Sequence, residues 1–181
     1  MSKRVRAYVG LGSNVGESRV TLQRAVRALG ALPDVRVRGV SRLYRTRPVG
    51  VTDQPDFLNA VVALDVPAGP DPETGALALL AALKMLEESF GRRERERWGP
   101  REVDLDLLVF GRHRVHVERP DGSWLQVPHP EARNRLFVLA PLADLAPRLR
   151  PPGWRETVEA ARRRRLATEG EEAVQAIGTI S

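Results

Sequence analysis

Two carboxylates, two residues apart, follow directly on a basic stretch of the chain. Asp104 and Asp106 open an apolar run that reaches Phe110 and comes after the breaker Gly99-Pro100. An apolar run with β-branched and aromatic members is typical of a strand. Side chains two apart on a strand share a face, so the two aspartates are expected to point the same way. Paired carboxylates, with water and phosphate oxygens, commonly hold Mg²⁺.

The basic stretch supplies cations. Its five arginines are Arg92, Arg93, Arg95, Arg97 and Arg101. Guanidinium groups offer forked donors to phosphate oxygens, so metal ligands beside these arginines indicate a polyphosphate substrate. Each half also has a plainer interpretation. An Asp-x-Asp can be a solvated strand edge, and arginines mixed with glutamates can form a solvated face whose ion pairs contribute about 0–1 kcal/mol each.

Composition limits the class of protein. The 181 residues are 42% hydrophobic and 29% charged, which predicts one globular domain over residues 1–181 with its own core. The absence of cysteine excludes disulfides and thiolate metal sites. A net charge of +6 indicates anionic partners, either nucleic acid or a nucleotide. The sequence shows neither a signal peptide nor the roughly 18 apolar residues of a membrane span, so we expect a cytoplasmic protein without membrane contact.

The order of the expected elements indicates a fold class. Hydrophobic periodicity predicts strands at 5–11, 35–44, 57–66 and 104–110, and helices at 17–29 and 71–90. Strand, helix, strand, strand, helix, strand is the split βαβ order of ferredoxin-like folds. We therefore expect an α+β fold with a ferredoxin-like βαββαβ core, in which helices pack on an antiparallel sheet. The segment Gly10–Asn14 lacks the endings of phosphate-binding loops and is interpreted as a tight turn bordering a site.

The remaining segments are less regular. A further strand is expected at 112–118, a helix or helical pair at 131–142 and an amphipathic helix at 154–166, whereas residues 167–181 are small and polar and predict poor order. Asn59 interrupts an apolar strand and needs partners, which are either nearby backbone, the favoured choice, or a polar ligand. His129 lies between two prolines and is either a surface loop residue or a ligand contact.

Four blocks occur in order along the chain: Gly10–Asn14; Tyr44–Thr46 with Asp53–Ala60; Arg97–Asp106; and Pro128–Pro130 through Asn134–Phe137. With these blocks the chain from Val5 to Leu149 resembles the 6-hydroxymethyl-7,8-dihydropterin pyrophosphokinases of the folate pathway. The resemblance implies a ferredoxin-like fold of αβα layers. It also implies transfer of pyrophosphate from MgATP to the pterin hydroxymethyl group, with release of AMP.

The resemblance assigns roles to individual residues. Asp104 and Asp106 would hold two Mg²⁺ ions, and Arg92 and Arg97 would act with them in catalysis. The expected ATP contacts are Glu87, Arg92, Arg97, Trp98, Arg101, Leu107, His129 and Arg135. The expected pterin contacts are Thr46, Val49, Phe57, Asn59, Trp98 and Phe137. In this second set the two phenylalanines would stack on the ring, the threonine and asparagine would bond its edge, and the tryptophan would lie in a loop that closes over the site.

Three positions depart from the family pattern and bear on single ATP contacts: Glu94 replaces a common arginine, Lys84 a common glutamine and Trp124 another arginine. A basic ferredoxin-like RNA-binding module is the alternative from another class. It fits the charge, but the chain lacks an aromatic-rich RNP pattern and places an acidic pair where phosphates would pass. An inactive relative is a third possibility, and the intact polar site residues argue against it. We expect ATP and the pterin as partners, no nucleic acid, and a monomer.

Overall fold

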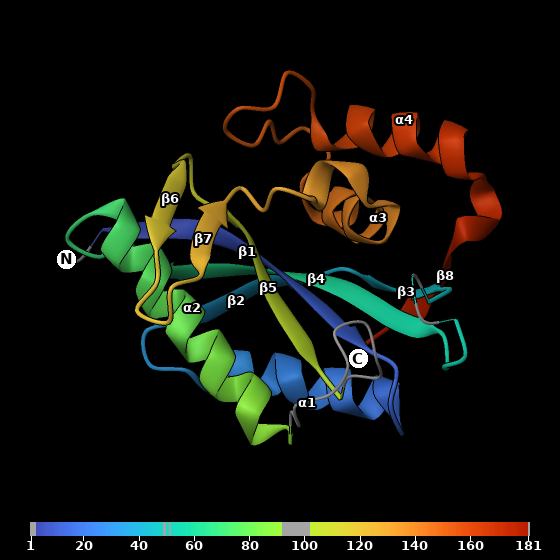
Figure 1. Cartoon of the computed structure of the whole chain (residues 1–181), viewed down its shortest axis with the longest axis horizontal. Coiled ribbons are helices and arrows are strands. Elements are labelled where there is room, and N and C mark those ends of the chain that lie inside the picture. Colours follow the sequence, from blue (N-terminus) through green and yellow to red (C-terminus); the bar gives the residue numbers. More distant parts are fainter. Residues whose placement is uncertain (1–2, 49, 51, 92–101, 181) are drawn as a thin grey trace.

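A computed structural model of the chain contains an antiparallel sheet, whose strands differ in length, with helices on both faces (Figure 1). It describes residues 3–48, 50, 52–91 and 102–180. The first elements are β1 (Arg4–Ser13), α1 (Ser18–Ala31), β2 (Arg36–Val40), β3 (Arg42–Thr46), β4 (Phe57–Pro67), α2 (Pro72–Ser89) and β5 (Asp104–Phe110). The strand order is β5-β1-β4-β3-β8, in which β8 (Val174–Thr179) is the C-terminal strand. β2 pairs with the half of β4 that β3 does not reach. The predicted α+β fold with its βαββαβ core is confirmed.

Two apolar layers enclose the sheet, because helices cover both of its faces. On one face, Leu22 of α1 and Leu83 of α2 are fully buried against Leu64 of β4. On the other face, Leu142 of α3 (Leu136–Leu145) and Val158 of α4 (Val158–Glu169) belong to a second buried cluster that includes residues of β1, β4 and β5. Figure 1 shows α3 between the sheet and α4. The αβα layering is therefore present, and α3 forms the roof over one sheet face.

The single strand expected at 35–44 is divided at Ser41. β2 pairs with β4 from Val62 to Asp65, whereas β3 pairs with β4 from Phe57 to Asn59. At the division Ser41 is buried, and its Oγ accepts the Val61 N–H at 2.8 Å. The backbone can bend there because a side-chain hydroxyl takes over one hydrogen bond of the ladder.

A hairpin follows β5. Its strands, β6 (Val115–Glu118) and β7 (Trp124–Val127), form a separate two-stranded sheet. The strand expected at 112–118 is thus present, whereas the four residues of β7 are too few to give a clear period. The helical pair expected at 131–142 consists of the short 3₁₀ helix η1 (Ala132–Asn134) and α3.

The C-terminal segment differs from the poor order that its composition predicts. A 3₁₀ turn, η2 (Glu171–Ala173), leads into β8 (Val174–Thr179), which pairs antiparallel with β3 at the sheet edge. Ile180 is buried, and Arg19 donates to the Ile177 carbonyl at 3.0 Å. Backbone pairing with an open edge strand orders a segment whose side chains have little apolar surface to bury.

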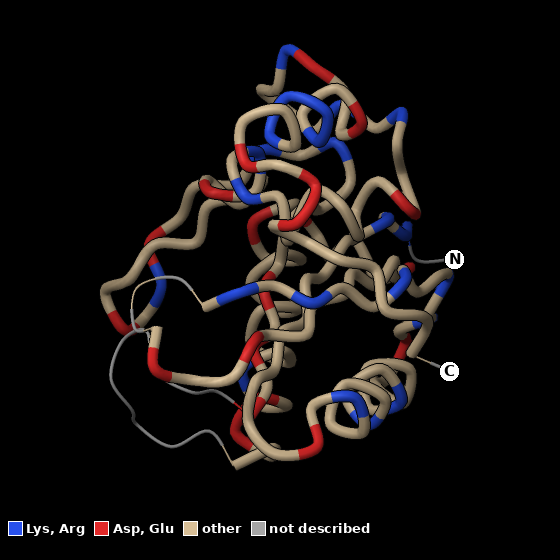
Figure 2. The backbone as a smooth tube through the Cα atoms, turned by 90° about the vertical axis from the view of Figure 1, so that its right-hand side faces the viewer, with Lys and Arg blue, Asp and Glu red and all other residues tan. Residues whose placement is uncertain are grey.

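Basic residues crowd along α4, at the top of the molecule in Figures 1 and 2, with acidic residues among them. The helix begins after Thr157, whose Oγ1 accepts the Ala160 N–H at 3.1 Å. Arg133 and Arg164 both pair with Glu156, which ties the start of α4 to the segment before α3. In the described part of the chain, no helix combines the length and apolarity needed to cross a bilayer.

One ion pair of α4 predicts a pH-dependent contribution to stability. The hydrogen bond from Arg162 lowers the pKa of Glu159 to about 2. A carboxyl whose pKa is lower in the folded state adds stability above its usual pKa and loses it as the pH falls toward the folded value. We expect Glu159→Gln to cost about 0.5 kcal/mol at pH 7 and progressively less below pH ~4. Urea unfolding of the wild type and the variant at pH 7 and at pH 3 measures this cost. An equal loss of unfolding free energy at the two pH values would contradict the prediction.

Candidate active site

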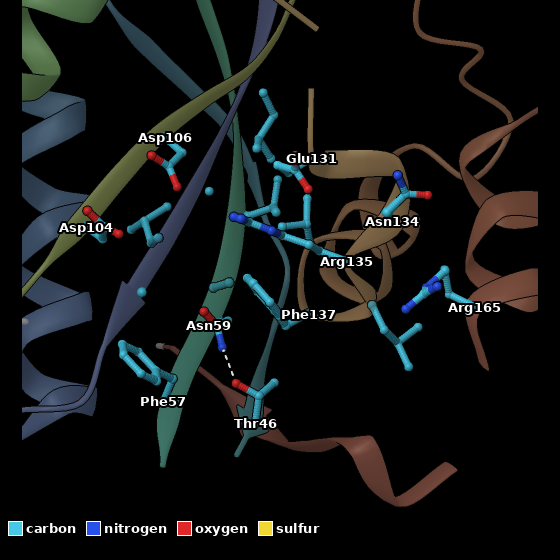
Figure 3. Close-up of a pocket in the computed structure, with 18 of the residues that line it drawn as sticks. Thr46, Phe57, Asn59, Asp104, Asp106, Glu131, Asn134, Arg135, Phe137 and Arg165 are labelled. Carbon is cyan, nitrogen blue, oxygen red and sulfur yellow. Dashed lines mark hydrogen bonds between the residues drawn. The ribbon is translucent and has the colours of Figure 1, made fainter. Parts of the chain in front are cut away.

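A cavity of about 520 Å³ lies on the sheet face that α3 covers, and Figure 3 shows the side chains that line it. Strands β1, β4 and β5 form its floor, the end of β3 and the start of β4 form one side, and η1 and α3 form the roof. Asp104 and Asp106 lie at one end of the view, and Arg165 of α4 lies at the opposite end.

The strand register places the two aspartates over a glycine-lined floor. Asp104 lies opposite Gly12 of β1, and Asp106 lies opposite Gly10. All four residues line the cavity, whereas Leu105, between the aspartates, is fully buried in the core on the other face. The glycine segment is therefore part of an extended strand rather than the tight turn that we expected. Its alternation leaves open space beside the carboxylates, because a residue without a side chain occupies each facing position.

The negative charges of Asp104 and Asp106 repel each other, and a cation bound between them would be favoured. Burial, followed by the charge of Asp104, raises the pKa of Asp106 to about 6, and Lys84 acts against this rise. A divalent ion between two such carboxylates would relieve their repulsion. Among the described residues, no group of three or more His, Asp or Glu is arranged to hold a metal. The two aspartates fit Mg²⁺, which takes few protein ligands and completes its shell with water and phosphate oxygens.

Glu87 lies behind β5 instead of lining this cavity. Its side chain is 1% exposed, and its Oε1 accepts the Leu105 N–H at 2.8 Å. Lys84 Nζ lies 3.2 Å from Oε2. The last turn of α2 is thereby fastened to β5 between the two aspartates. The apolar stripe of α2 could not reveal this, because Glu87 lies off the stripe and its acceptor role depends on a strand 18 residues away.

Asn59 and Thr46 form a buried polar pair on the cavity wall. Asn59 Nδ2 donates to Thr46 Oγ1 at 2.8 Å, the dashed line in Figure 3. This partner is a side chain and not the backbone, which we had favoured. A Cβ atom on Gly12 would come within 3.1 Å of Asn59 Oδ1, so the missing side chain gives this oxygen its space. The pair thus keeps an acceptor oxygen beside the cavity floor.

Two aromatic rings and one cation line the middle of the cavity. Phe57, at the start of β4, and Phe137, in the first turn of α3, both line the cavity. The Arg135 guanidinium lies 5.7 Å from the centroid of the Phe137 ring. Its charge also acts on Asp106, where it opposes the rise in pKa. Arg135 therefore lies between the aromatic part of the cavity and the carboxylates, within the electrostatic reach of both.

His129 and Leu107, both expected ATP contacts, do not line this cavity. His129 N–H donates to the Leu108 carbonyl at 2.8 Å, and its Nδ1 accepts the Glu131 N–H at 3.2 Å. Burial, with the nearby Arg135 charge, lowers the pKa of His129, so the ring is neutral at pH 7 with Nε2 as a donor. Leu107 is 3% exposed within the core.

Five predicted site residues lie outside the described residues: Val49, Arg92, Arg97, Trp98 and Arg101. The cavity also contains side chains that sequence reasoning did not select, among them Glu131, Asn134, Arg165 and Glu169. Arg165 and Glu169 are four apart on one helix, a spacing that ordinarily indicates a surface ion pair. No local pattern could have placed them at this cavity.

Comparison with known proteins agrees with the motifs. Residues 8–147 match the model of the 7,8-dihydro-6-hydroxymethylpterin-pyrophosphokinase (HPPK) family. The chain is 46% identical over 154 residues to a 2-amino-4-hydroxy-6-hydroxymethyldihydropteridine pyrophosphokinase of Pseudomonas aeruginosa, covering 85% of this chain and 88% of that one. It is 42% identical over 139 residues to the Bacillus subtilis protein of the same name, covering 77% of each.

Solved structures show the same fold at low sequence identity. A crystal structure of Plasmodium falciparum HPPK-DHPS with pteroate superposes with a TM-score of 0.77 at 14% identity, covering 97% of this chain. The match covers 44% of that longer chain, so the present chain spans about half of its length. The family assignment rests on the family model and the sequence relatives, whereas the solved structures show the fold. The chain belongs to the 7,8-dihydro-6-hydroxymethylpterin-pyrophosphokinase family of folate biosynthesis, the family that its four sequence blocks resemble.

Proposed function

We propose that this chain transfers the pyrophosphate of MgATP to the hydroxymethyl group of 6-hydroxymethyl-7,8-dihydropterin and releases AMP. The observation that carries this is one cavity with a same-face carboxylate pair at one end and two aromatic rings with a buried Asn–Thr pair beside it. The first arrangement suits metal-bound phosphates, and the second suits a flat heterocycle with polar edges.

The central part of the cavity would hold the pterin. Phe57 and Phe137 would stack on the ring, each contributing roughly 0.5–1.5 kcal/mol beyond area burial. Asn59 would present Oδ1 to a ring N–H, because its amide nitrogen already donates to Thr46 at 2.8 Å. A pterin bound there would direct its 6-hydroxymethyl group toward the aspartates, since the reacting oxygen has to meet the phosphates.

The carboxylate end would hold the reacting phosphates. Asp104 and Asp106 are the residues that would hold Mg²⁺, which when bound neutralises phosphate charge and acidifies the attacking hydroxyl. The hydroxyl oxygen would form a bond to the β-phosphorus of ATP and lose its proton to solvent. The bond between the β-phosphorus and the α,β-bridging oxygen would break, and AMP would leave with that oxygen. Arg135 would add a fixed positive charge to this step. Arg92, Arg97 and Arg101 would contribute further donors to ATP, and Trp98 would help to exclude water.

Product identity tests this function. We expect the protein, mixed with 6-hydroxymethyl-7,8-dihydropterin and MgATP, to form AMP and the pterin diphosphate in equal amounts. Formation should depend on the pterin and stop when a chelator removes Mg²⁺. ADP as the only nucleotide product, or no turnover with fresh substrate, would refute the proposal.

The monomeric state and the cytoplasmic location remain predictions from the sequence. Gel filtration with light scattering tests the monomeric state.

The glycine floor yields a second prediction. In Gly12→Ala the new methyl group would lie 3.1 Å from Asn59 Oδ1 and push Asn59 away from Thr46. We expect the KM for the pterin to rise about tenfold, as for the loss of one good hydrogen bond, with the KM for ATP nearly unchanged. Gly30→Ala, on α1, is the matched control, because its methyl group would meet only a side-chain carbon of Val37 on β2, at 3.4 Å. Equal pterin KM values in the two variants would contradict the role of Gly12.

A further inference from the structure

A single carboxylate near the end of α3 accepts hydrogen bonds from two residues of β3. The backbone N–H, Nε and Nη2 of Arg42 donate to Asp144 at 3.0, 3.2 and 2.9 Å. The Tyr44 hydroxyl donates to Asp144 Oδ1 at 2.8 Å. The Asp144 side chain is 16% exposed, and Tyr44 is buried. Hydrogen bonds to an ionised acceptor are stronger than neutral ones, so this carboxylate is a strong link between α3 and the sheet.

Both ends of this link lie on surfaces that also form the cavity wall. On β3, Tyr44 and Thr46 are two apart, so they share a face, and Tyr44 lies opposite Asn59 of β4. On α3, Phe137 and Asp144 are seven apart, which is two turns, so they lie on one side of the helix. The link therefore joins the helix side that carries Phe137 to the strand face that carries Thr46.

Apolar packing between α3 and β3 is incomplete. A second cavity of about 350 Å³ lies between α3, α4, β3 and β8, and Arg42, Tyr44 and Asp144 all line it. Towards the middle of the sheet the packing is complete, because Leu142 is fully buried in the cluster that includes Val61. Leu142 thus holds one side of α3, and the hydrogen bonds of Asp144 hold the other side. Together the two contacts set the rotation of α3 about its own axis.

We propose that Asp144 is a positioning residue for the pterin, which sets the rotation of α3 and thereby the spacing between the Phe137 and Phe57 rings. This inference rests on the proposed function. In the view of Figure 3 the two rings lie on either side of Asn59. A helix rotation of about 10° moves a side-chain tip roughly 6 Å from the axis by about 1 Å. A gap of roughly 0.5–1 Å already removes about a quarter to a half of the dispersion attraction in a contact.

The plainer interpretation is an ion pair that only stabilises the fold, since the Arg42 side chain is 57% exposed. Asp65 offers a matched control for that interpretation. Its carboxylate accepts Arg6 Nε at 2.7 Å and lies 3.3 Å from Arg38 Nε. These three residues belong to β4, β1 and β2, away from the described lining of the cavity. Asp144→Asn and Asp65→Asn therefore remove comparable charged contacts, and only the first involves α3.

A double-mutant cycle with the Phe137 ring tests the role without ATP. Fluorescence titration with 6-hydroxymethylpterin gives the Kd of the wild type, Asp144→Asn, Phe137→Leu and the double variant. We expect Asp144→Asn to raise the Kd about fivefold alone and less than about twofold beside Phe137→Leu, because no ring is then left to position. Asp65→Asn should change the Kd by less than about twofold in both backgrounds. In steady-state kinetics Asp144→Asn should raise the KM for the dihydropterin and leave the KM for ATP unchanged.

Three results would overturn the proposal: an equal rise in Kd from Asp144→Asn with and without the Phe137 ring, equal weakening by Asp65→Asn, or a rise in the KM for ATP alone. If circular dichroism shows that Asp144→Asn does not fold, Tyr44→Phe takes its place in the cycle, because it deletes only one donor. A Kd rise of about two- to threefold that requires the Phe137 ring supports the role. An unchanged Kd, or a rise that is independent of the ring, overturns it.

Failure of the proposed function has a separate signature. A wild-type protein that forms no AMP, but shows the coupling between Asp144 and Phe137 in pterin binding, would refute the reaction and support the positioning role. Normal AMP formation without that coupling would refute the positioning role alone.

Discussion

Replacing Asp106 with alanine is expected to reduce pterin-dependent AMP formation by at least about 10³-fold, or roughly 4 kcal/mol of transition-state stabilisation. Asp106 lines the cavity beside Asp104, opposite Gly10 of β1, and no third carboxylate, histidine or other such group joins them among residues 3–48, 50, 52–91 and 102–180. One remaining ligand cannot replace a pair, because Mg²⁺ would be held by a single charge.

The same substitution should leave the fold intact. Removing Asp106 also removes its repulsion from Asp104, so without Mg²⁺ the variant is expected to unfold at a temperature no lower than that of the wild type. Calorimetry and a coupled AMP assay measure the two effects on one preparation. Glu118→Ala, on the exposed outer face of β6, is the control and should match the wild type in both. Activity of Asp106→Ala within tenfold of the control would refute the metal assignment.

Replacing Glu87 with alanine is expected to destabilise the protein by about 2–4 kcal/mol. The substitution leaves the Leu105 N–H buried without its acceptor, which now lies at 2.8 Å, and opens space between α2 and β5. It also leaves Lys84 without the carboxylate at 3.2 Å. Leu105 lies between the two proposed metal ligands, so kcat should fall as well, through displacement of the strand.

Two comparisons isolate the cause. Glu87→Gln keeps an oxygen that can accept from Leu105 and should lose less than half as much stability as the alanine variant. Glu88→Ala removes the neighbouring, exposed glutamate of the same helix and should change stability by no more than about 0.5 kcal/mol. Urea unfolding of the three variants decides the matter. If Glu87→Ala and Glu88→Ala unfold at the same urea concentration, the hydrogen bond between Glu87 and Leu105 does not stabilise the fold.

The local pattern of the sequence was sufficient for the frame of this molecule. Period-2 and period-3.6 alternation predicted the core elements, except that the single strand expected at 35–44 is divided into β2 and β3. A two-residue spacing predicted that Asp104 and Asp106 share a face. These features depend only on residues adjacent in the chain, since the direction of a side chain follows from the backbone geometry of its own element. The four ordered blocks likewise predicted the family that the comparisons confirm. An RNA-binding module, the alternative that fitted the charge, is not supported by these matches.

The tertiary structure decided what depends on distant partners. Composition alone predicted poor order after residue 167, yet β8 is ordered by pairing with β3, more than 120 residues earlier. The glycines of β1 belong to a strand because both β4 and β5 pair with it there. Asn59 donates a hydrogen bond to the side chain of Thr46 on β3, and Glu87 accepts one from the backbone of Leu105 on β5. Arg165 and Glu169 came to the cavity only because α4 packs over α3. Hydrogen bonds and packing between remote segments have no period in the sequence, so only the folded chain shows them.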